Sequence, residues 1–130
     1  MLFRSRSVAE PVAGTAYDFT TEREVGDVVI DHCFGDLARG ADGRAVVRLG
    51  GVELWVDESW SWLQVFTGDV LPAGTPEHPV PPGTGPRESV AVEPMTAPPD
   101  AFNSGRDLVV LEPGASWSGS FGVRRVRDQS

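Results

Sequence analysis

One acidic residue stands out because its neighbours fit a strand that ends beside it. Glu93 follows the alternating run Ser89-Val-Ala-Val92 and precedes Pro94. Val90 and Val92 are predicted to fill one face of the strand, while Pro94 ends it and leaves the carboxylate at a turn. A carboxylate fixed in such a position can serve as a general base. The alternative interpretation is a solvated carboxylate at a strand end.

A second group of reactive side chains is formed by Asp31, His32 and Cys33, inside the apolar segment 28–34. Neighbours on a strand point to opposite faces, so Asp31 and His32 are predicted to face apart. All three are metal-ligand types, but adjacent residues rarely converge on one ion, and no paired spacing occurs elsewhere. We therefore predict no metal site, and we expect His32 to pack. Asp31 is either a ligand-binding carboxylate or a turn or capping residue.

Four tryptophans, at positions 55, 60, 62 and 117, offer flat aromatic surfaces. Aromatic planes stack on the apolar faces of sugar rings, and they equally fill protein cores. Packing in the core or against a second sheet is the simpler interpretation of all four.

The elements that position these residues are predicted to be short strands joined by turns. Glycine (15 residues) and proline (11 residues) are frequent, and no long helical period occurs. Strands are predicted at 28–34, 45–49, 51–57, 60–66, 89–93, 108–112 and 116–125. The segment 10–25 is expected to lie extended across a sheet, with Tyr17 and Phe19 on one face. The strands between 45 and 66 are expected to form an antiparallel meander.

Alternation is most regular from Gly51 to Asp57. It predicts one face with Val52, Leu54 and Val56, and an opposite face with Glu53, Trp55 and Asp57. Turns are predicted at 42–43, 58–59 and 113–114. The segment 70–88 contains six prolines, so it cannot form a central strand. We interpret it as a variable surface loop, with a lid over a site as the alternative.

Composition and charge limit the possible functions. A chain of 130 residues with 40% hydrophobic content can form one domain with one small core. Its net charge of −8, with eleven arginines and no lysine, predicts no nucleic-acid partner, because phosphate binding needs excess positive charge. The single cysteine, Cys33, cannot form an internal disulfide. With no signal-peptide pattern and no apolar stretch of about 18 residues, we predict a cytoplasmic protein without membrane contact.

Five motifs carry a resemblance to a known family. They are Tyr17-Asp-Phe-Thr-Thr, Ile30-Asp-His-Cys-Phe34, Trp62-Leu-Gln-Val-Phe-Thr-Gly-Asp69, Ser89-Val-Ala-Val-Glu93-Pro-Met-Thr-Ala-Pro-Pro-Asp100-Ala-Phe-Asn103 and Leu108-Val-Val-Leu-Glu-Pro-Gly114. From about Pro11 onward the chain resembles the C-terminal part of aldose 1-epimerases, the galactose mutarotase family, and residues 1–10 match poorly. The resemblance implies an all-β fold, with residues 1–130 forming an antiparallel β-sandwich that is part of a galactose-mutarotase-like supersandwich.

The resemblance also implies roles for individual residues. Glu93 matches the family's catalytic base, and we expect it to be partly buried beside Pro94. Asp31 matches an acidic residue that hydrogen-bonds sugar hydroxyls, while Trp62 and Phe66 lie nearest to a matching motif and are predicted to contact the sugar. The chemistry needs no cofactor. The family's catalytic acid is a histidine from the first half of the domain, and neither His32 nor His78 lies in a matching motif.

We therefore predict an aldose 1-epimerase-like protein that interconverts the anomers of a glucose- or galactose-class aldose, without the family's catalytic histidine region. The alternatives are a non-catalytic carbohydrate-binding or interaction module, and a fragment with no function of its own. Half of a sandwich exposes a sheet edge. We accordingly predict dimerisation or association with a separate N-terminal half.

Overall fold

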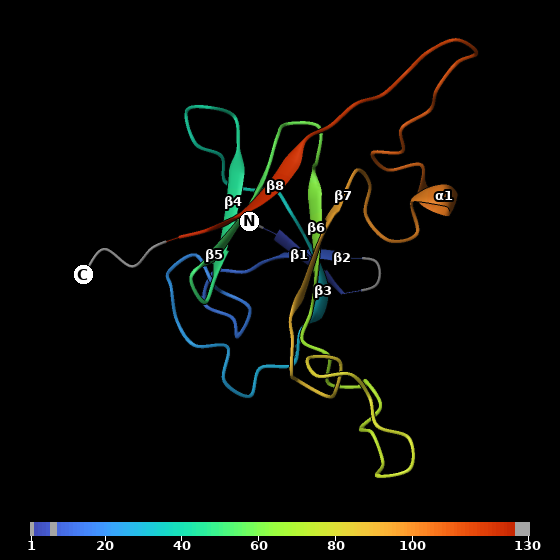
Figure 1. Ribbon diagram of the computed structural model, residues 1–130. Coiled ribbons are helices and arrows are strands. Elements are labelled where there is room, and N and C mark those ends of the chain that lie inside the picture. Colours follow the sequence, from blue (N-terminus) through green and yellow to red (C-terminus); the bar gives the residue numbers. More distant parts are fainter. Residues whose placement is uncertain (1, 6–7, 127–130) are drawn as a thin grey trace.

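The computed structural model describes residues 2–5 and 8–126, with side chains from Glu10 onward (Figure 1). Its regular secondary structure is almost entirely antiparallel strands, which are joined by long irregular segments. The strands are β1 (Leu2–Ser5), β2 (Val8–Pro11), β3 (Asp31–Gly35), β4 (Ala45–Leu49), β5 (Val52–Val56), β6 (Trp62–Phe66), β7 (Ala91–Met95) and β8 (Phe121–Arg125). A single turn of helix, α1 (Ala101–Ser104), follows β7. The predicted all-β fold class is confirmed. None of the helices in the described part of the chain is long and apolar enough to cross a membrane.

The strands form two sheets. The five-stranded sheet has the order β2-β1-β3-β6-β7, and the three-stranded sheet has the order β4-β5-β8. Every strand pair is antiparallel. Because side chains alternate along each strand, each sheet has an inner and an outer face. On the outer face of the five-stranded sheet, Cys33 and Trp62 are nevertheless buried.

The core consists of two buried clusters on the inner face of the five-stranded sheet, and one of them reaches the three-stranded sheet. One buried cluster contains Val12, Ile30 and Phe34, and Tyr17 and Phe19 pack against it, as expected for an extended segment lying across a sheet. The second buried cluster joins the sheets through Leu37, Ala45, Val56 and Leu63. Each strand contributes every second residue to these clusters. The residues in between, on β3, β6 and β7, lie on the outer face of the sheet.

Two of the strand predictions are confirmed almost residue for residue. Ala45–Leu49 and Val52–Val56 form a hairpin, with Val56 in the core and Glu53 on the opposite face. The predicted meander is wrong at its third strand, because β6 leaves this hairpin and pairs with β3 and β7. Large apolar side chains occur on both faces of β6, and such a strand suits the interior of the larger sheet.

Other predictions near the C-terminus need correction. The strand predicted to stop at Glu93 continues through Pro94 to Met95, since β7 is an edge strand and an edge tolerates proline. The strand predicted at 108–112 is irregular, and its Val110 is 73% exposed, because no neighbouring strand covers it. Of the strand predicted at 116–125, only Phe121–Arg125 forms. The loop 70–88 contains no strand, as predicted.

Candidate functional site on the five-stranded sheet

The outer face of the five-stranded sheet carries most of the residues singled out in the sequence. Cys33, Gln64 and Glu93 are register partners and form one row across β3, β6 and β7. Asp31 and Phe66 are also register partners and lie on the same face, two residues along their strands from this row. Neighbouring strands lie about 4.8 Å apart, so these side chains share a patch the size of a small ligand.

Asp31 is held in place by a side chain from the neighbouring strand. The Gln64 side chain donates from Nε2 to Asp31 Oδ1 at 2.8 Å. Asp31 is exposed, and among the described residues its Oδ2 atom has no hydrogen-bond partner. One carboxylate oxygen is therefore oriented by the protein, and the other can accept a hydrogen bond from a ligand.

Glu93 projects from the edge strand into solvent. It is exposed, so the partial burial expected beside Pro94 is wrong: β7 is an edge strand, and little of the described chain covers this side chain. Within residues 10–126, no side chain forms a hydrogen bond or ion pair with its carboxylate. Glu93 is thus a negatively charged group without a neighbouring cation, next to the amide of its register partner Gln64.

Trp62 forms a wall at one end of this face. Its side chain is buried at 3% exposure, and its ring lies directly over Gly35, where an added Cβ would be 2.3 Å from Cζ3. Its Nε1 donates to Asp107 Oδ2 at 2.9 Å, and the Arg106 guanidinium lies 5.0 Å from the ring. Both faces of the Trp62 ring are therefore largely covered. Phe66, by contrast, is half-buried and is the register partner of Asp31.

Gln64 is the site residue that the sequence interpretation missed. The predicted sugar contacts in this motif are its aromatic residues Trp62 and Phe66, and Gln64 lies between them, two residues from each. Residues i, i+2 and i+4 of a strand share a face, so the alternation already placed this amide beside the two aromatic side chains. Its contact with Asp31 needed the pairing of β3 with β6.

Neither histidine belongs to the outer face. His32 is the register partner of Val65 and stacks against Tyr17, with 4.3 Å between ring centroids, which confirms that it faces away from Asp31. Burial holds the pKa of His32 below its usual value, although the nearby Asp31 charge acts in the opposite direction. His78 lies in the loop 70–88 and makes backbone hydrogen bonds with Thr75. Within the described residues, no group of three or more His, Cys, Asp or Glu side chains could hold a metal ion.

The chain is similar in sequence to known proteins. The family model for aldose 1-epimerase matches residues 6–124. An uncharacterized protein of Escherichia coli K12, YihR, is 35% identical over 100 residues, which are 75% of this chain and 27% of YihR. The chain thus spans about a quarter of the length of this curated relative. No solved structure showed a significant match.

Proposed function

The chain belongs to the aldose 1-epimerase family, and we propose that the outer face of its five-stranded sheet binds an aldose and interconverts the sugar's α and β anomers. The observation that carries this proposal is the placement of Asp31, Gln64 and Glu93 on one open face. Both carboxylates are exposed and neither has a cationic partner among the described residues. They remain available to accept hydrogen bonds or protons from a sugar.

In the proposed reaction, Glu93 acts as the general base. Its carboxylate takes the proton of the C1 hydroxyl, the oxygen electron pair forms a C1 carbonyl, and the bond between C1 and the ring oxygen breaks. An acid protonates the ring oxygen as it leaves. Rotation about the C1–C2 bond, followed by the reverse steps on the other face of the carbonyl, produces the second anomer. Each positioned acid or base contributes roughly 10²–10⁴ in rate.

Asp31 and Gln64 orient the sugar in this proposal. The hydrogen bond from Gln64 leaves Asp31 Oδ2 directed at the ligand, where it accepts a sugar hydroxyl proton. The Gln64 side chain, one strand from Glu93, keeps this binding group at a constant separation from the base. Phe66 contributes apolar surface beside Asp31.

We propose that the catalytic acid is supplied by another polypeptide, either a separate N-terminal half or a second copy of this chain. His32 lies on the inner face and His78 in the loop 70–88, so neither shares the Glu93 row. The aligned region is 27% of YihR, so most of the length of that relative lies outside it. Exposed apolar side chains on the three-stranded sheet support such an association or a dimer, notably Phe121 (53% exposed) and Val123 (65% exposed). A stable monomer in light scattering, with a sharp thermal transition, would contradict this association. The cytoplasmic location remains a prediction from the sequence.

A binding module is the second candidate function. It is favoured by the same observation, because a face with Asp31 and Gln64 but no histidine beside Glu93 can hold a sugar without opening its ring. The two candidates predict different effects of the same substitution: Glu93→Gln removes the base of an epimerase but only one hydrogen-bond acceptor of a binding module.

Polarimetry of freshly dissolved α-D-glucose or α-D-galactose tests the proposal. Where the acid is supplied, we expect acceleration of mutarotation, its loss by roughly 10²-fold or more in Glu93→Gln, and its retention in the exposed control Glu24→Gln. An acceleration that survives Glu93→Gln would overturn the assignment of the base. If no variant accelerates the reaction, calorimetry decides the rest: heat of sugar binding favours the module, and its absence rejects both functions.

A further inference from the structure

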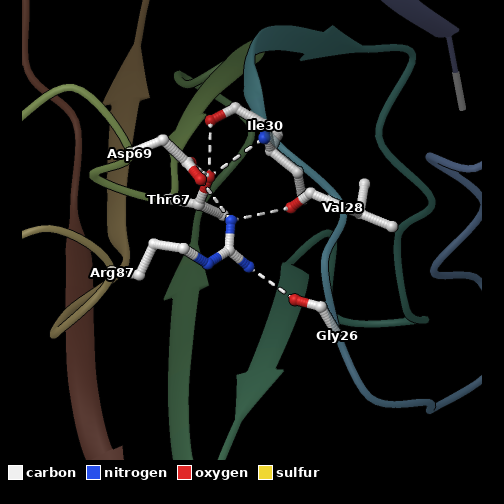
Figure 2. Close-up of polar contacts among 6 residues, drawn as sticks. All are labelled: Gly26, Val28, Ile30, Thr67, Asp69 and Arg87. Carbon is white, nitrogen blue, oxygen red and sulfur yellow. Dashed lines mark hydrogen bonds and ion pairs between the residues drawn. The ribbon is translucent and has the colours of Figure 1, made fainter.

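One guanidinium connects the segments that enter and leave the strands of the site (Figure 2). Arg87, in the approach to β7, donates to the Gly26 carbonyl and, at 3.4 Å, to the Val28 carbonyl, both in the approach to β3. It also forms an ion pair with Asp69, which follows β6. A single side chain thus links β3, β6 and β7, the three strands that carry Asp31, Gln64 and Glu93.

Thr67 continues this connection into the sheet. Its backbone N–H donates to the Ile30 carbonyl at 2.9 Å, and its hydroxyl accepts the Ile30 N–H at 3.0 Å. The hydroxyl also contacts the Asp69 carboxylate, and Thr67 is only 2% exposed. We call Arg87, Asp69 and Thr67 the Arg87 clamp. Because a residue at the centre of the clamp is fully packed, the clamp is fixed relative to the sheet.

The ion pair inside the clamp persists at neutral pH. Hydrogen bonds from Thr67 and Arg87, with the Arg87 charge, hold the pKa of Asp69 below its usual value against the effect of burial. The Asp69 side chain is 18% exposed, which limits screening of the pair by solvent. Arg87 itself has φ of 56°, a left-handed conformation that is uncommon outside glycine, and the clamp holds it there.

The clamp lies directly beside the sugar-orienting row. Ile30 immediately precedes Asp31, and Thr67 immediately follows Phe66, the register partner of Asp31. Asp69 and Arg87 are also close to the two ends of the loop 70–88, so their ion pair closes this loop at its base. Movements of the loop are therefore separated from the strand ends that carry the site.

We propose that Arg87 is a positioning residue of the sugar site, which sets the separation between Asp31 and Glu93 by fixing the ends of their strands. The inference rests on the proposed function, because that separation matters only if both carboxylates act on one ligand. Arg87 does not touch the sugar in this proposal. A guanidinium suits the task because its planar fork donates to a carboxylate and to carbonyl groups at the same time.

The chain contains a matched control. Arg39 also bridges backbone carbonyls, from Gly43 at 3.0 Å, Asp57 at 3.1 Å and Trp60 at 2.7 Å. Its partners lie in the turn before β4 and in the segment that joins β5 to β6, and among the described residues no hydrogen bond links Arg39 to the clamp. Substitution of Arg39 therefore measures the loss of a guanidinium bridge without disturbing the Asp31 row.

The experiment compares Arg87→Met, Arg87→Lys and Arg39→Met by calorimetric titration with galactose and by NMR of the Gln64 side-chain amide. Its resonance, identified by its loss in Gln64→Ala, reports the 2.8 Å hydrogen bond to Asp31 whether or not sugar binds. All spectra are recorded well below each melting temperature. We expect Arg87→Met to shift this resonance and to weaken galactose binding roughly 10-fold, because misplacement of a positioned group by about 1 Å costs up to about 100-fold.

Arg87→Lys is expected to recover part of both effects through the pair with Asp69, and Arg39→Met to lower the melting temperature without either effect. An unshifted Gln64 amide in Arg87→Met, or an equal shift in Arg39→Met, would overturn the inference. If the wild-type protein binds no sugar, the proposed function fails, while the amide resonance still decides whether Arg87 positions Asp31. If Arg87→Met does not fold, Asp69→Asn takes its place, with the same shift expected in smaller measure.

Discussion

The outer faces of the two sheets each carry a glutamate in a row of register partners, but the two glutamates differ in their cationic neighbours and in their exposure. On the three-stranded sheet, Arg48, Glu53 and Arg124 are register partners in one row, and both arginines pair with the Glu53 carboxylate. On the five-stranded sheet, the corresponding row ends at Glu93, which is exposed and has no cation beside it among the described residues. Glu53, by contrast, is only 2% exposed.

This difference separates the structural role of Glu53 from the role proposed for Glu93. Burial acts to raise the pKa of Glu53, but the hydrogen bonds and charges of Arg48 and Arg124 outweigh it and hold that pKa below its usual value. Glu53 therefore remains an ion engaged with two partners and serves the structure. Glu93 lacks such partners among the described residues, and this contrast is what supports its proposed role as a base.

Each sheet also covers a glycine with a tryptophan, and substitution of the glycine gives the largest expected effect. An added Cβ would lie 2.3 Å from Trp62 at Gly35, and 2.6 Å from Trp55 at Gly122. Trp62 is buried and held by Asp107, whereas Trp55 is half-buried and can move outward. We expect Gly35→Ala to destabilise the protein by about 1–3 kcal/mol and Gly122→Ala by clearly less.

Urea unfolding of the two alanine variants measures this difference. Equal losses of stability would show that the two outer faces adapt equally well to an added methyl group. The contrast between the five-stranded and the three-stranded sheet would then rest on their carboxylates alone. Sugar titration of Gly35→Ala adds a second readout, because displacement of Trp62 alters one end of the candidate site.

The next largest effect is expected from matched substitutions of the two glutamates. Glu53→Gln removes the negative charge between two arginines, so we expect the melting temperature to fall by several degrees. Glu93→Gln replaces an exposed side chain and is expected to change stability by no more than about 0.5 kcal/mol. Thermal unfolding followed by circular dichroism tests both, and a larger loss in Glu93→Gln would refute the assignment of structural and chemical roles.

The smallest expected effect concerns acid. Because the folded-state pKa of Glu53 lies below its ordinary value of 4.5, its ionisation stabilises the folded state above about pH 4.5, and this contribution is lost as the pH falls through the lowered pKa. The pKa of Asp69 is lowered similarly. We expect the melting temperature to decline below pH 4.5, and less steeply in Glu53→Gln. Identical slopes in the two proteins would contradict the compensation described for Glu53.

Local pattern was sufficient for much of the fold. The strands 45–49 and 52–56, the placement of Glu53 on the face opposite to Val56, and the separation of Asp31 from His32 all follow from alternation between neighbours. The same reasoning failed for 108–112, where an apolar run has the character of a strand but finds no partner. It also placed β6 in the wrong sheet, because alternation describes the faces of a strand and not its neighbours.

The sequence by itself determined the family, most of the segments that form strands, and the alternation that places the side chains of Val92 and Glu93 on opposite faces of β7. Only the tertiary structure decided which carboxylates are compensated, that Gln64 orients Asp31, and that Arg87 reaches carbonyls 59 and 61 residues away. The physical reason is one of range. Side-chain alternation is a property of adjacent residues, whereas ion pairs and hydrogen bonds across a sheet depend on strand order, which is settled by packing of the whole core.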